Sequence, residues 1–382
     1  MVLRIRCMTL LILGLCLARP DSCHAEPPPL YLGQSAVLSG PAQNLGLEMR
    51  AGLLAAFSLI NDQGGIKGQE VVLISRDDGY EPDKAVRNTK DLIFEDKVFA
   101  LIGAVGTPTA KAVIPLINDA RIPFVGPFTG AEVLRAPFQP YVINVRASYY
   151  QELEKLASFL VDGKKYRRIA CFYQNDSYGY DGLRGIEIAL ARRGMALVSQ
   201  GSYERNTVAV MGALQDIYEA RPEVVVMVGA YAACAEFIKL SKIKVGGKVK
   251  FCNISFVGTE SLRQVLGGYG EDVVVSQVVP YPVETDIELV REYKGAMAKY
   301  QHDSPISFIS LEGYMSGKLF GAIAQRVEGE LTREKFIAAM ETSGRFDLGG
   351  LMLQFGPGDH QGLDEVYLTS IYPKVRTLGP GE

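Results

Sequence analysis

Glycine and hydroxyl residues follow apolar runs at three places in the first half of this 382-residue chain. The three loops are residues 39–44, 103–109 and 127–130. Ligands of open α/β sheets bind at the carboxyl ends of strands, where helix N-termini offer free N–H groups to anions. Gly106 allows close approach of the backbone, and Thr107 can cap a helix or donate to a ligand. Phe128 and Thr129 occupy the third loop. These loops are candidate sites for a carboxylate, although ordinary α/β turns have the same composition.

Three residues in the second half could complete such a site. Tyr178 follows one strand-like run, Tyr231 follows a second and Glu260 follows a third. Two tyrosines and a carboxylate at strand ends suit an amphipathic ligand that bears a cation. The alternative is that the tyrosines pack on the surface and that Glu260 belongs to the first turn of a helix.

Catalytic motifs are absent from the sequence. There is no G-x-G-x-x-G after a strand, no P-loop, no G-x-S-x-G elbow and no H-E-x-x-H. Beyond the N-terminal leader only His302 and His360 remain, which leaves little for a triad or a metal cage. Asp77 and Asp78 are read as turn-capping residues, since a general acid/base pair would need a partner. We therefore predict no catalytic residue, no metal and no cofactor, and an exported enzyme is disfavoured.

The N-terminus predicts export. Two arginines precede the uncharged apolar run 9–17, and a small residue, Ala25, ends the leader. This order is that of a signal peptide, residues 1–25, cleaved after Ala25, which predicts a periplasmic protein. A membrane anchor would need about 20 apolar residues. Cys16 raises the alternative of a lipoprotein, but Leu15 stands where that motif has Gly or Ala.

The composition of the chain narrows the classes of partner that it could bind. The net charge is −3, and no basic stretch indicates nucleic acid. Three cysteines remain after the leader: Cys171, Cys234 and Cys252. An odd number leaves at least one thiol free or paired between chains, and a bond between Cys234 and Cys252 stays open. Cys171 lies in an apolar run and is expected to be buried.

Short apolar runs alternate with helix-length amphipathic segments, which indicates an α/β fold. The expected strands are residues 30–38, 70–76, 99–103, 122–126, 168–173, 196–200, 223–229, 250–258 and 272–279. The expected helices include residues 47–61, 82–96, 110–120, 150–162 and 180–193, then 284–300, 308–327 and 332–342. Near-continuous β-branched runs are typical of strands covered on both faces. Two such blocks predict two lobes, and the later runs 351–355 and 365–371 are expected to join existing sheets.

The order of these motifs resembles the periplasmic branched-chain amino-acid-binding proteins, the Leu/Ile/Val-binding type of ABC-transporter receptor. The resemblance rests on Ser39-Gly40-Pro41, on the string 61–68 with its Gly-Gly-Ile-Lys-Gly, on Asp77-Asp78, and on residues 103–115, 122–124, 176–179, 229–231 and 258–260. It spans nearly the whole chain after the leader. It implies a type I periplasmic binding fold, with two Rossmann-like lobes joined by a three-stranded hinge. Lobe 1 would be residues 30–144 with 280–342, and lobe 2 residues 145–279 with 343–382.

The resemblance also implies roles for single residues. Thr107 matches the hydroxyl residue that holds a ligand carboxylate, and Glu260 matches the acidic residue that pairs with an α-ammonium. Tyr178 and Tyr231 match two tyrosines that close over the ligand. Phe128 departs from the pattern, because small residues usually occupy that loop, and Thr129 matches only with a shift of one residue. Gly106 replaces a cysteine, and Leu45 stands where some members have an aromatic residue.

These matches imply a monomeric transport protein that binds an amino acid or related polar molecule and closes over it. The closed form would deliver the solute to ABC permease subunits in the membrane. A sensor of the same fold that feeds a signalling receptor is the first alternative. A receptor for amides or aromatic acids is the second, since the departures remodel the side-chain pocket.

Overall fold

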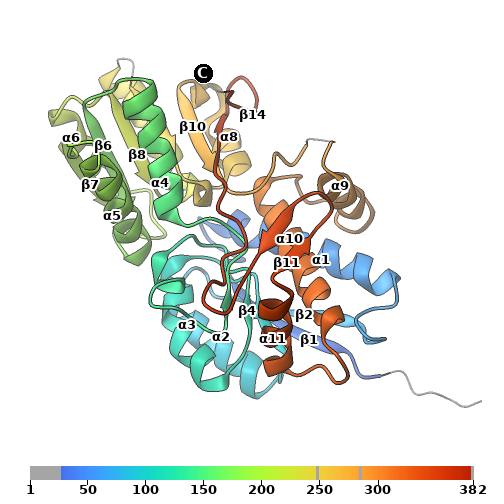
Figure 1. Cartoon of the computed structure of the whole chain (residues 1–382). Helices are drawn as coiled ribbons and strands as arrows, with labels where there is room; N and C mark the ends of the chain where they lie inside the picture. The colour runs from blue at the N-terminus through green and yellow to red at the C-terminus, as the bar shows by residue number, and fades with distance from the viewer. Residues whose placement is uncertain (1–26, 247–248, 284–285, 380–382) are drawn as a thin grey trace, which may run out of the picture.

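The computed structural model describes residues 27–246, 249–283 and 286–379. The predicted signal peptide, residues 1–25, lies outside the described residues. The chain forms two α/β lobes that stand side by side (Figure 1). No helix in the described part of the chain is both long and apolar enough to cross a membrane.

A five-stranded parallel sheet forms the centre of lobe 1, in the order β2-β1-β3-β4-β5. Its strands are β1 (Leu30–Ala36), β2 (Val71–Asp77), β3 (Ala100–Ile102), β4 (Phe124–Val125) and β5 (Val142–Ile143). The helices between these strands are α1 (Gln43–Asp62), α2 (Pro82–Phe94) and α3 (Thr107–Ala120). The short β5 was not expected from the sequence, because its two apolar residues carry no periodic signal.

A seven-stranded sheet forms the centre of lobe 2, in the order β14-β13-β10-β9-β8-β6-β7. Its strands are β6 (Ile169–Gln174), β7 (Ser199–Tyr203), β8 (Val224–Val228), β9 (Lys250–Asn253), β10 (Val273–Gln277), β13 (Tyr367–Ser370) and β14 (Arg376–Thr377). The helices of this lobe are α4 (Tyr149–Ala157), α5 (Ser177–Ala191), α6 (Met211–Glu219), α7 (Tyr231–Leu240) and α8 (Thr259–Leu266). β6 to β10 are parallel, whereas β13 and β14 are antiparallel additions at one edge.

Three helices follow the second sheet in sequence: α9 (Glu288–Tyr300), α10 (Phe308–Arg326) and α11 (Arg333–Ser343). α9 and α10 pack against α1 of lobe 1. The approach of α1 to α10 requires glycine, because a Cβ on Gly52 would lie 1.9 Å from the carbonyl oxygen of Ser310. A Cβ on Gly313 would likewise lie 2.3 Å from the carbonyl oxygen of Met49. The helix-rich tail thus covers lobe 1.

One expectation about the tail is wrong. The run 351–355 does not join an existing sheet, because β12 (Met352–Gln354) pairs only with β11 (Arg345–Asp347). This pair lies beside α10, where the Arg326 guanidinium covers the Phe346 ring at 4.1 Å. The run 365–371 does join a sheet, as β13. The residue boundaries of the two lobes otherwise stay a prediction.

The chain passes between the lobes three times: after β5, after β10 and after β12. Two of these crossings are hydrogen-bonded to each other. The Asn144 amide donates to the His360 carbonyl at 2.8 Å, and the Gly362 amide donates to the Asn144 carbonyl at 2.8 Å. Connecting segments between two lobes can absorb changes in backbone angle. The arrangement is therefore compatible with hinge motion of one lobe against the other.

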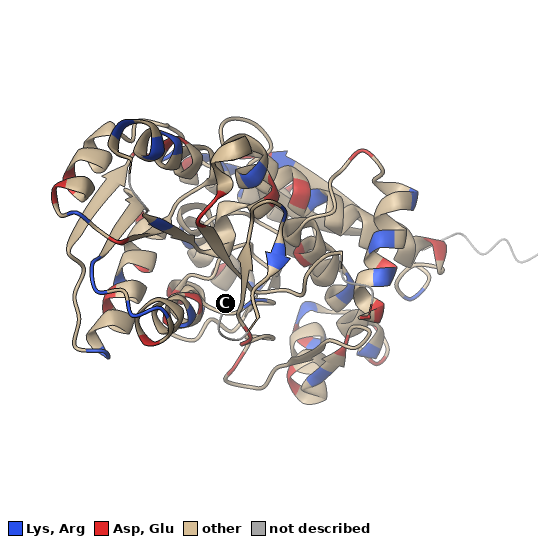
Figure 2. Ribbon diagram, turned by 90° about the horizontal axis from the view of Figure 1, so that it is seen from above, with Lys and Arg blue, Asp and Glu red and all other residues tan. Residues whose placement is uncertain are grey.

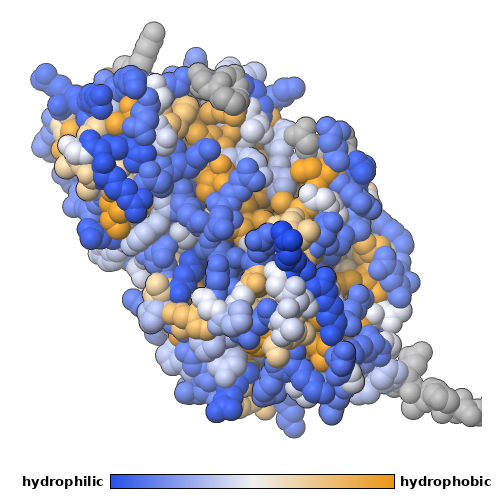
Figure 3. All heavy atoms as spheres, in the orientation of Figure 1, coloured by the Kyte–Doolittle hydropathy of each residue, from blue (hydrophilic) through white to orange (hydrophobic). Residues whose placement is uncertain are grey.

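Residues of both charge signs occur along the helices of the two lobes. Lys and Arg are interspersed with Asp and Glu on the helices of both lobes (Figure 2). In the view of Figure 3 the surface is largely hydrophilic, with smaller hydrophobic patches on both lobes. This surface resembles that of ordinary globular proteins more than that of a nucleic-acid-binding face.

Candidate functional site

Gly106 and Thr107 lie where β3 leads into α3, on the edge of lobe 1 that faces lobe 2. Gly106 caps the helix with φ +101°, a conformation that favours glycine. A Cβ at Gly106 would lie 2.1 Å from the Tyr80 ring, so only glycine lets that ring pack here. The first turn of α3 holds no acidic side chain, which leaves its N–H groups available to an anion.

Three buried hydroxyls meet at this helix end. The Thr107 and Thr129 Oγ1 atoms lie 2.7 Å apart, and the Thr129 hydroxyl donates to the Tyr149 hydroxyl at 3.1 Å. Burial raises the pKa of Tyr149, so its phenol stays protonated at neutral pH. We call Thr107, Thr129 and Tyr149 the hydroxyl cluster. It can donate hydrogen bonds to a carboxylate.

Aromatic rings from both lobes surround the hydroxyl cluster. Phe128 of lobe 1 stacks on Phe256 of lobe 2, with ring centroids 5.3 Å apart. Tyr178 packs on Phe256 at 4.5 Å and on Tyr149 at 5.4 Å, and Tyr80 lies 6.2 Å from Phe256. All five rings are buried. We call Tyr80, Phe128, Tyr149, Tyr178 and Phe256 the aromatic cluster.

Tyr178 presents an unused hydrogen-bonding group to this cluster. It lies in the first turn of α5, which the Asp176 side chain caps by accepting from the Tyr178 amide at 3.0 Å. Its hydroxyl is buried and has no hydrogen-bond partner within residues 27–246, 249–283 and 286–379. Burial raises its pKa well above the usual range, with the phenols of Tyr149, Tyr80 and Tyr203 nearby. A buried hydroxyl without a partner is costly and needs a reason.

Tyr231 and Glu260 lie in a neighbouring group. Tyr231 begins α7 and packs beside Gly258 and Leu45. Glu260 lies in the first turn of α8, 3.5 Å from Arg263, and it lines a cavity of about 580 Å³ together with Glu48. Burial raises the pKa of Glu260, whereas Arg263 lowers it. The structure therefore brings Gly106, Thr107, Phe128, Thr129 and Tyr178 together. Tyr231 and Glu260 lie outside this group, near Leu45 and Glu48 respectively.

Polar contacts join the lobes on either side of the aromatic cluster. On one side the Arg205 guanidinium of lobe 2 lies 2.9 Å from Glu81 of lobe 1. On the other side the Asn44 amide of lobe 1 donates to the Ser261 hydroxyl of lobe 2 at 3.0 Å, and that hydroxyl donates to Glu48 at 3.2 Å. The structure thus shows the lobes in contact across the predicted site.

A buried charge cluster lies behind Phe128. Arg146, in the first crossing between the lobes, is 3.0 Å from Glu152 of α4 and 3.7 Å from Glu312 of α10. It also donates to the Ser255 hydroxyl, and its guanidinium covers the Phe128 ring at 5.0 Å. Burial raises the pKa of Glu312 to about 7, opposed by Arg146.

The sequence did not single out four residues at this centre: Tyr80, Tyr149, Arg146 and Phe256. Tyr80 follows a strand end, as the predicted residues do, so that signal was present for it. Phe256 fell inside the expected strand 250–258, whereas β9 ends at Asn253, so the local pattern contained no such signal for it. Arg146 carried none, because an arginine between two lobes is ordinarily exposed.

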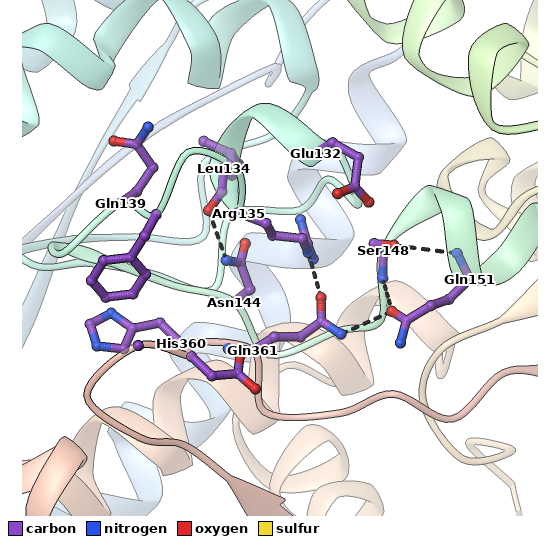
Figure 4. A pocket seen from close by; sticks show the side chains of 12 residues that line it. Glu132, Leu134, Arg135, Gln139, Asn144, Ser148, Gln151, His360 and Gln361 are labelled. Carbon is purple, nitrogen blue, oxygen red and sulfur yellow. Dashed lines mark hydrogen bonds between the residues drawn. The ribbon is translucent and has the colours of Figure 1, made fainter. Parts of the chain in front are cut away.

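A further cavity lies beside the hinge and holds none of the predicted residues (Figure 4). It measures about 260 Å³ and is lined by residues of the 132–139 loop and of two crossings. Arg135 donates to Gln361 at 2.5 Å there, and Asn144 donates to the Leu134 carbonyl at 3.2 Å. In Figure 4 these side chains bridge the loop and the hinge segments, so they brace the hinge.

The three cysteines of the described chain are apart from one another and buried. Cys171, Cys234 and Cys252 are buried and free, so the bond between Cys234 and Cys252 that the sequence left open is not formed. Burial raises the pKa of each thiol, which disfavours the thiolate. No group of three or more His, Cys, Asp or Glu residues is placed to hold a metal among the described residues.

Known proteins share the fold of this chain over most of its length. The periplasmic binding protein family matches residues 29–374. A possible leucine/isoleucine/valine-binding protein from Rhodopirellula baltica is 38% identical, with TM-score 0.89 over 94% of this chain and 98% of that one. A substrate-binding periplasmic protein from Ralstonia solanacearum is 28% identical, with TM-score 0.85 over 91% and 100%. Leu/Ile/Val-binding protein homolog 7 of Brucella abortus is 26% identical, covering 82% of this chain and 79% of that protein. The chain belongs to the periplasmic binding protein family and is a solute-binding protein with the type I fold of that family.

Proposed function

We propose that this protein is the solute-binding component of an ABC importer and that it binds an amino acid or a related small carboxylate by hinge closure. The hydroxyl cluster at the N-terminus of α3 carries this proposal. Thr107 and Thr129 come from lobe 1 and Tyr149 follows the first crossing, so one bound carboxylate would engage both sides of the hinge. The names of the Rhodopirellula and Brucella relatives support an amino acid as the solute.

The remaining predicted residues complete the proposed binding shell. Thr107 and the N–H groups of α3 would bind the carboxylate while the lobes are open. Tyr178, Tyr231 and Glu260 of lobe 2 would join on closure and exclude water. Glu260 would pair with an α-ammonium group, which requires it to exchange its contact with Arg263 for one with the solute. Phe128 and Gly106 would shape the pocket.

Export, delivery and oligomeric state belong to the same proposal. Cleavage after Ala25 would release the protein into the periplasm, and the closed monomer would dock on permease subunits in the membrane. The alternative role is that of a sensor for a signalling receptor, which the same two lobes could serve. Neighbouring genes separate the two: permease and ATPase genes favour transport, whereas a kinase or chemoreceptor gene favours sensing.

A thermal-shift screen of the purified protein tests the proposal. The panel should hold amino acids, their amides and simple carboxylates. A solute at a hundred times its dissociation constant adds about 2.7 kcal/mol to the free energy of unfolding, which raises the melting temperature visibly. A saturable shift with any member supports a solute-binding role. No shift with any member at millimolar concentration would contradict it.

A further inference from the structure

We propose that the solute carries a flat aromatic ring as well as its carboxylate. This inference rests on the proposed function and concerns the body of the solute. It leaves open whether the solute also bears an ammonium group, so aromatic amino acids and simple aromatic acids both belong to the proposed class.

The walls of the site carry the first part of the argument. Phe128 of lobe 1 and Phe256 of lobe 2 stack with an interplanar angle of 27°. Tyr178 and Tyr80 pack around the same Phe256 ring at 4.5 Å and 6.2 Å. When the hinge opens, Phe128 separates from Phe256, and two aromatic faces are exposed opposite each other. A flat ring can enter between them and keep an aromatic contact on both faces, which a branched aliphatic chain cannot do.

The unpartnered hydroxyl of Tyr178 carries the second part. It is buried, it has no hydrogen-bond partner in the described parts of the chain, and its ring contacts Tyr149 of the hydroxyl cluster. A protein rarely keeps such a group without a use for it. A solute oxygen held by Thr107, Thr129 and Tyr149 would supply the missing partner. The hydroxyl therefore marks the polar end of the site, next to the aromatic faces.

Charge around the site carries the third part. The Arg146 guanidinium lies 5.0 Å from the Phe128 ring centre and 5.9 Å from that of Tyr149, so the wall of the site is backed by a buried cation. Two carboxyl groups lie against that cation, Glu152 at 3.0 Å and Glu312 at 3.7 Å, and Asp176 is paired with Arg205 at 3.0 Å. These carboxyl groups are held by arginines, which limits their repulsion of an anionic solute end at the hydroxyl cluster. Together the three observations describe a carboxylate attached to a ring.

Matched pairs of probes test the inference by isothermal titration of the purified protein. Benzoate is compared with cyclohexanecarboxylate, and L-phenylalanine with L-cyclohexylalanine, because each pair keeps its charge and size and differs in aromaticity. We expect the aromatic member of at least one pair to bind roughly tenfold tighter than its saturated partner. Equal or weaker binding of the aromatic member in both pairs would overturn the inference.

Titration with L-leucine and L-valine separates a failure of this inference from a failure of the proposed function. If L-leucine or L-valine binds saturably and no aromatic probe does, the inference is wrong and the solute-binding role stands. If neither these amino acids, the four probes nor any member of the broader screen binds, both are wrong. Binding of phenylalanine alone, or of benzoate alone, supports the inference and tells which source the aromatic carboxylate has.

The variant Tyr178→Phe tests the unpartnered hydroxyl. It removes one atom that has no partner in the protein, so the melting temperature without solute should stay the same or rise. Affinity for the tighter aromatic probe should fall roughly tenfold. Tyr218→Phe is the matched control, since Tyr218 of α6 bonds Ser241 within lobe 2 and should leave affinity unchanged. Unchanged affinity in Tyr178→Phe would contradict the placement of the carboxylate at this hydroxyl.

Discussion

The rings of Phe128 and Phe256 stack 5.3 Å apart although they come from different lobes of the protein. Phe128 follows β4 of lobe 1 and Phe256 lies in a short 3-10 turn after β9 of lobe 2. Both loops lie at the carboxyl ends of parallel strands, which is where open α/β sheets bind ligands. The pair therefore joins the lobes at the proposed solute site, and solute entry must separate it.

Thr107→Val tests the hydroxyl cluster. The change keeps the shape of the side chain but removes the hydroxyl 2.7 Å from Thr129. We expect the affinity for a carboxylate solute to fall about tenfold, since hydrogen bonds to charged groups contribute about 1.5–3 kcal/mol. Isothermal titration measures the affinity, and the melting temperature without solute shows whether the fold has survived. Full affinity in a folded variant would remove Thr107 from the site.

Glu260→Gln tests the proposed ammonium contact. The amide keeps the size of the side chain but loses its charge. We expect affinity for an α-amino acid to fall at least about tenfold, because a buried ammonium would lose its ionic partner. Affinity for a carboxylate without an ammonium group should stay the same, which provides the control within the same variant. Equal losses for both kinds of solute would show that Glu260 does not recognise the ammonium.

Arg205→Met tests whether the ion pair beside the aromatic cluster holds the lobes together. The ion pair with Glu81 crosses between the lobes, whereas Arg193 pairs with Glu154 inside lobe 2. Partly exposed pairs contribute up to about 1 kcal/mol, so Arg205→Met should weaken solute binding roughly two- to fivefold. Arg193→Met, the matched control, should lower the melting temperature without changing affinity. If both variants bind as well as the parent protein, this contact does not stabilise closure.

Glu48 predicts a pH dependence of stability. Burial raises its pKa to about 7, with hydrogen bonds from Ser307 and Ser261 opposing the shift and Glu260 adding to it. The folded state thus favours the protonated form. Its stabilising contribution is complete below the ordinary value of 4.5 and is lost as the pH rises through about 7. We expect the melting temperature to fall between pH 5 and pH 8, and to fall less in Glu48→Gln. The same slope in both proteins would contradict the assignment.

The strand-and-helix pattern was sufficient to predict most of the fold. The β-branched run of β8 and the glycines after α1 gave strong local signals, and both elements formed where expected. The expected strand at 196–200 lies instead at Ser199–Tyr203, since its residues carry weak alternation. Residues 351–355 were misjudged because pairing partners are chosen by tertiary contacts that a local pattern does not contain.

Part of the candidate site could also be predicted from local sequence signals. Thr107 and Tyr178 stand at strand ends, so a topological rule could find them. Whether Phe128 meets Phe256, or Asn44 reaches Ser261, depends on how the hinge brings the two lobes together. A local sequence pattern does not encode the angle between the two lobes. The burial of Arg146 was equally hidden, because its partners Glu152 and Glu312 come from different lobes.

Isothermal titration of the purified protein with small carboxylates is the most direct test of the central claim, which is that a solute carboxylate binds at the hydroxyl cluster between the lobes. We predict binding of one solute per chain, with a negative heat-capacity change from the apolar surface that closure buries, and with affinity reduced in Thr107→Val. Tight binding that is indifferent to Thr107→Val and Tyr178→Phe together, in folded variants, would place the solute elsewhere and contradict the claim.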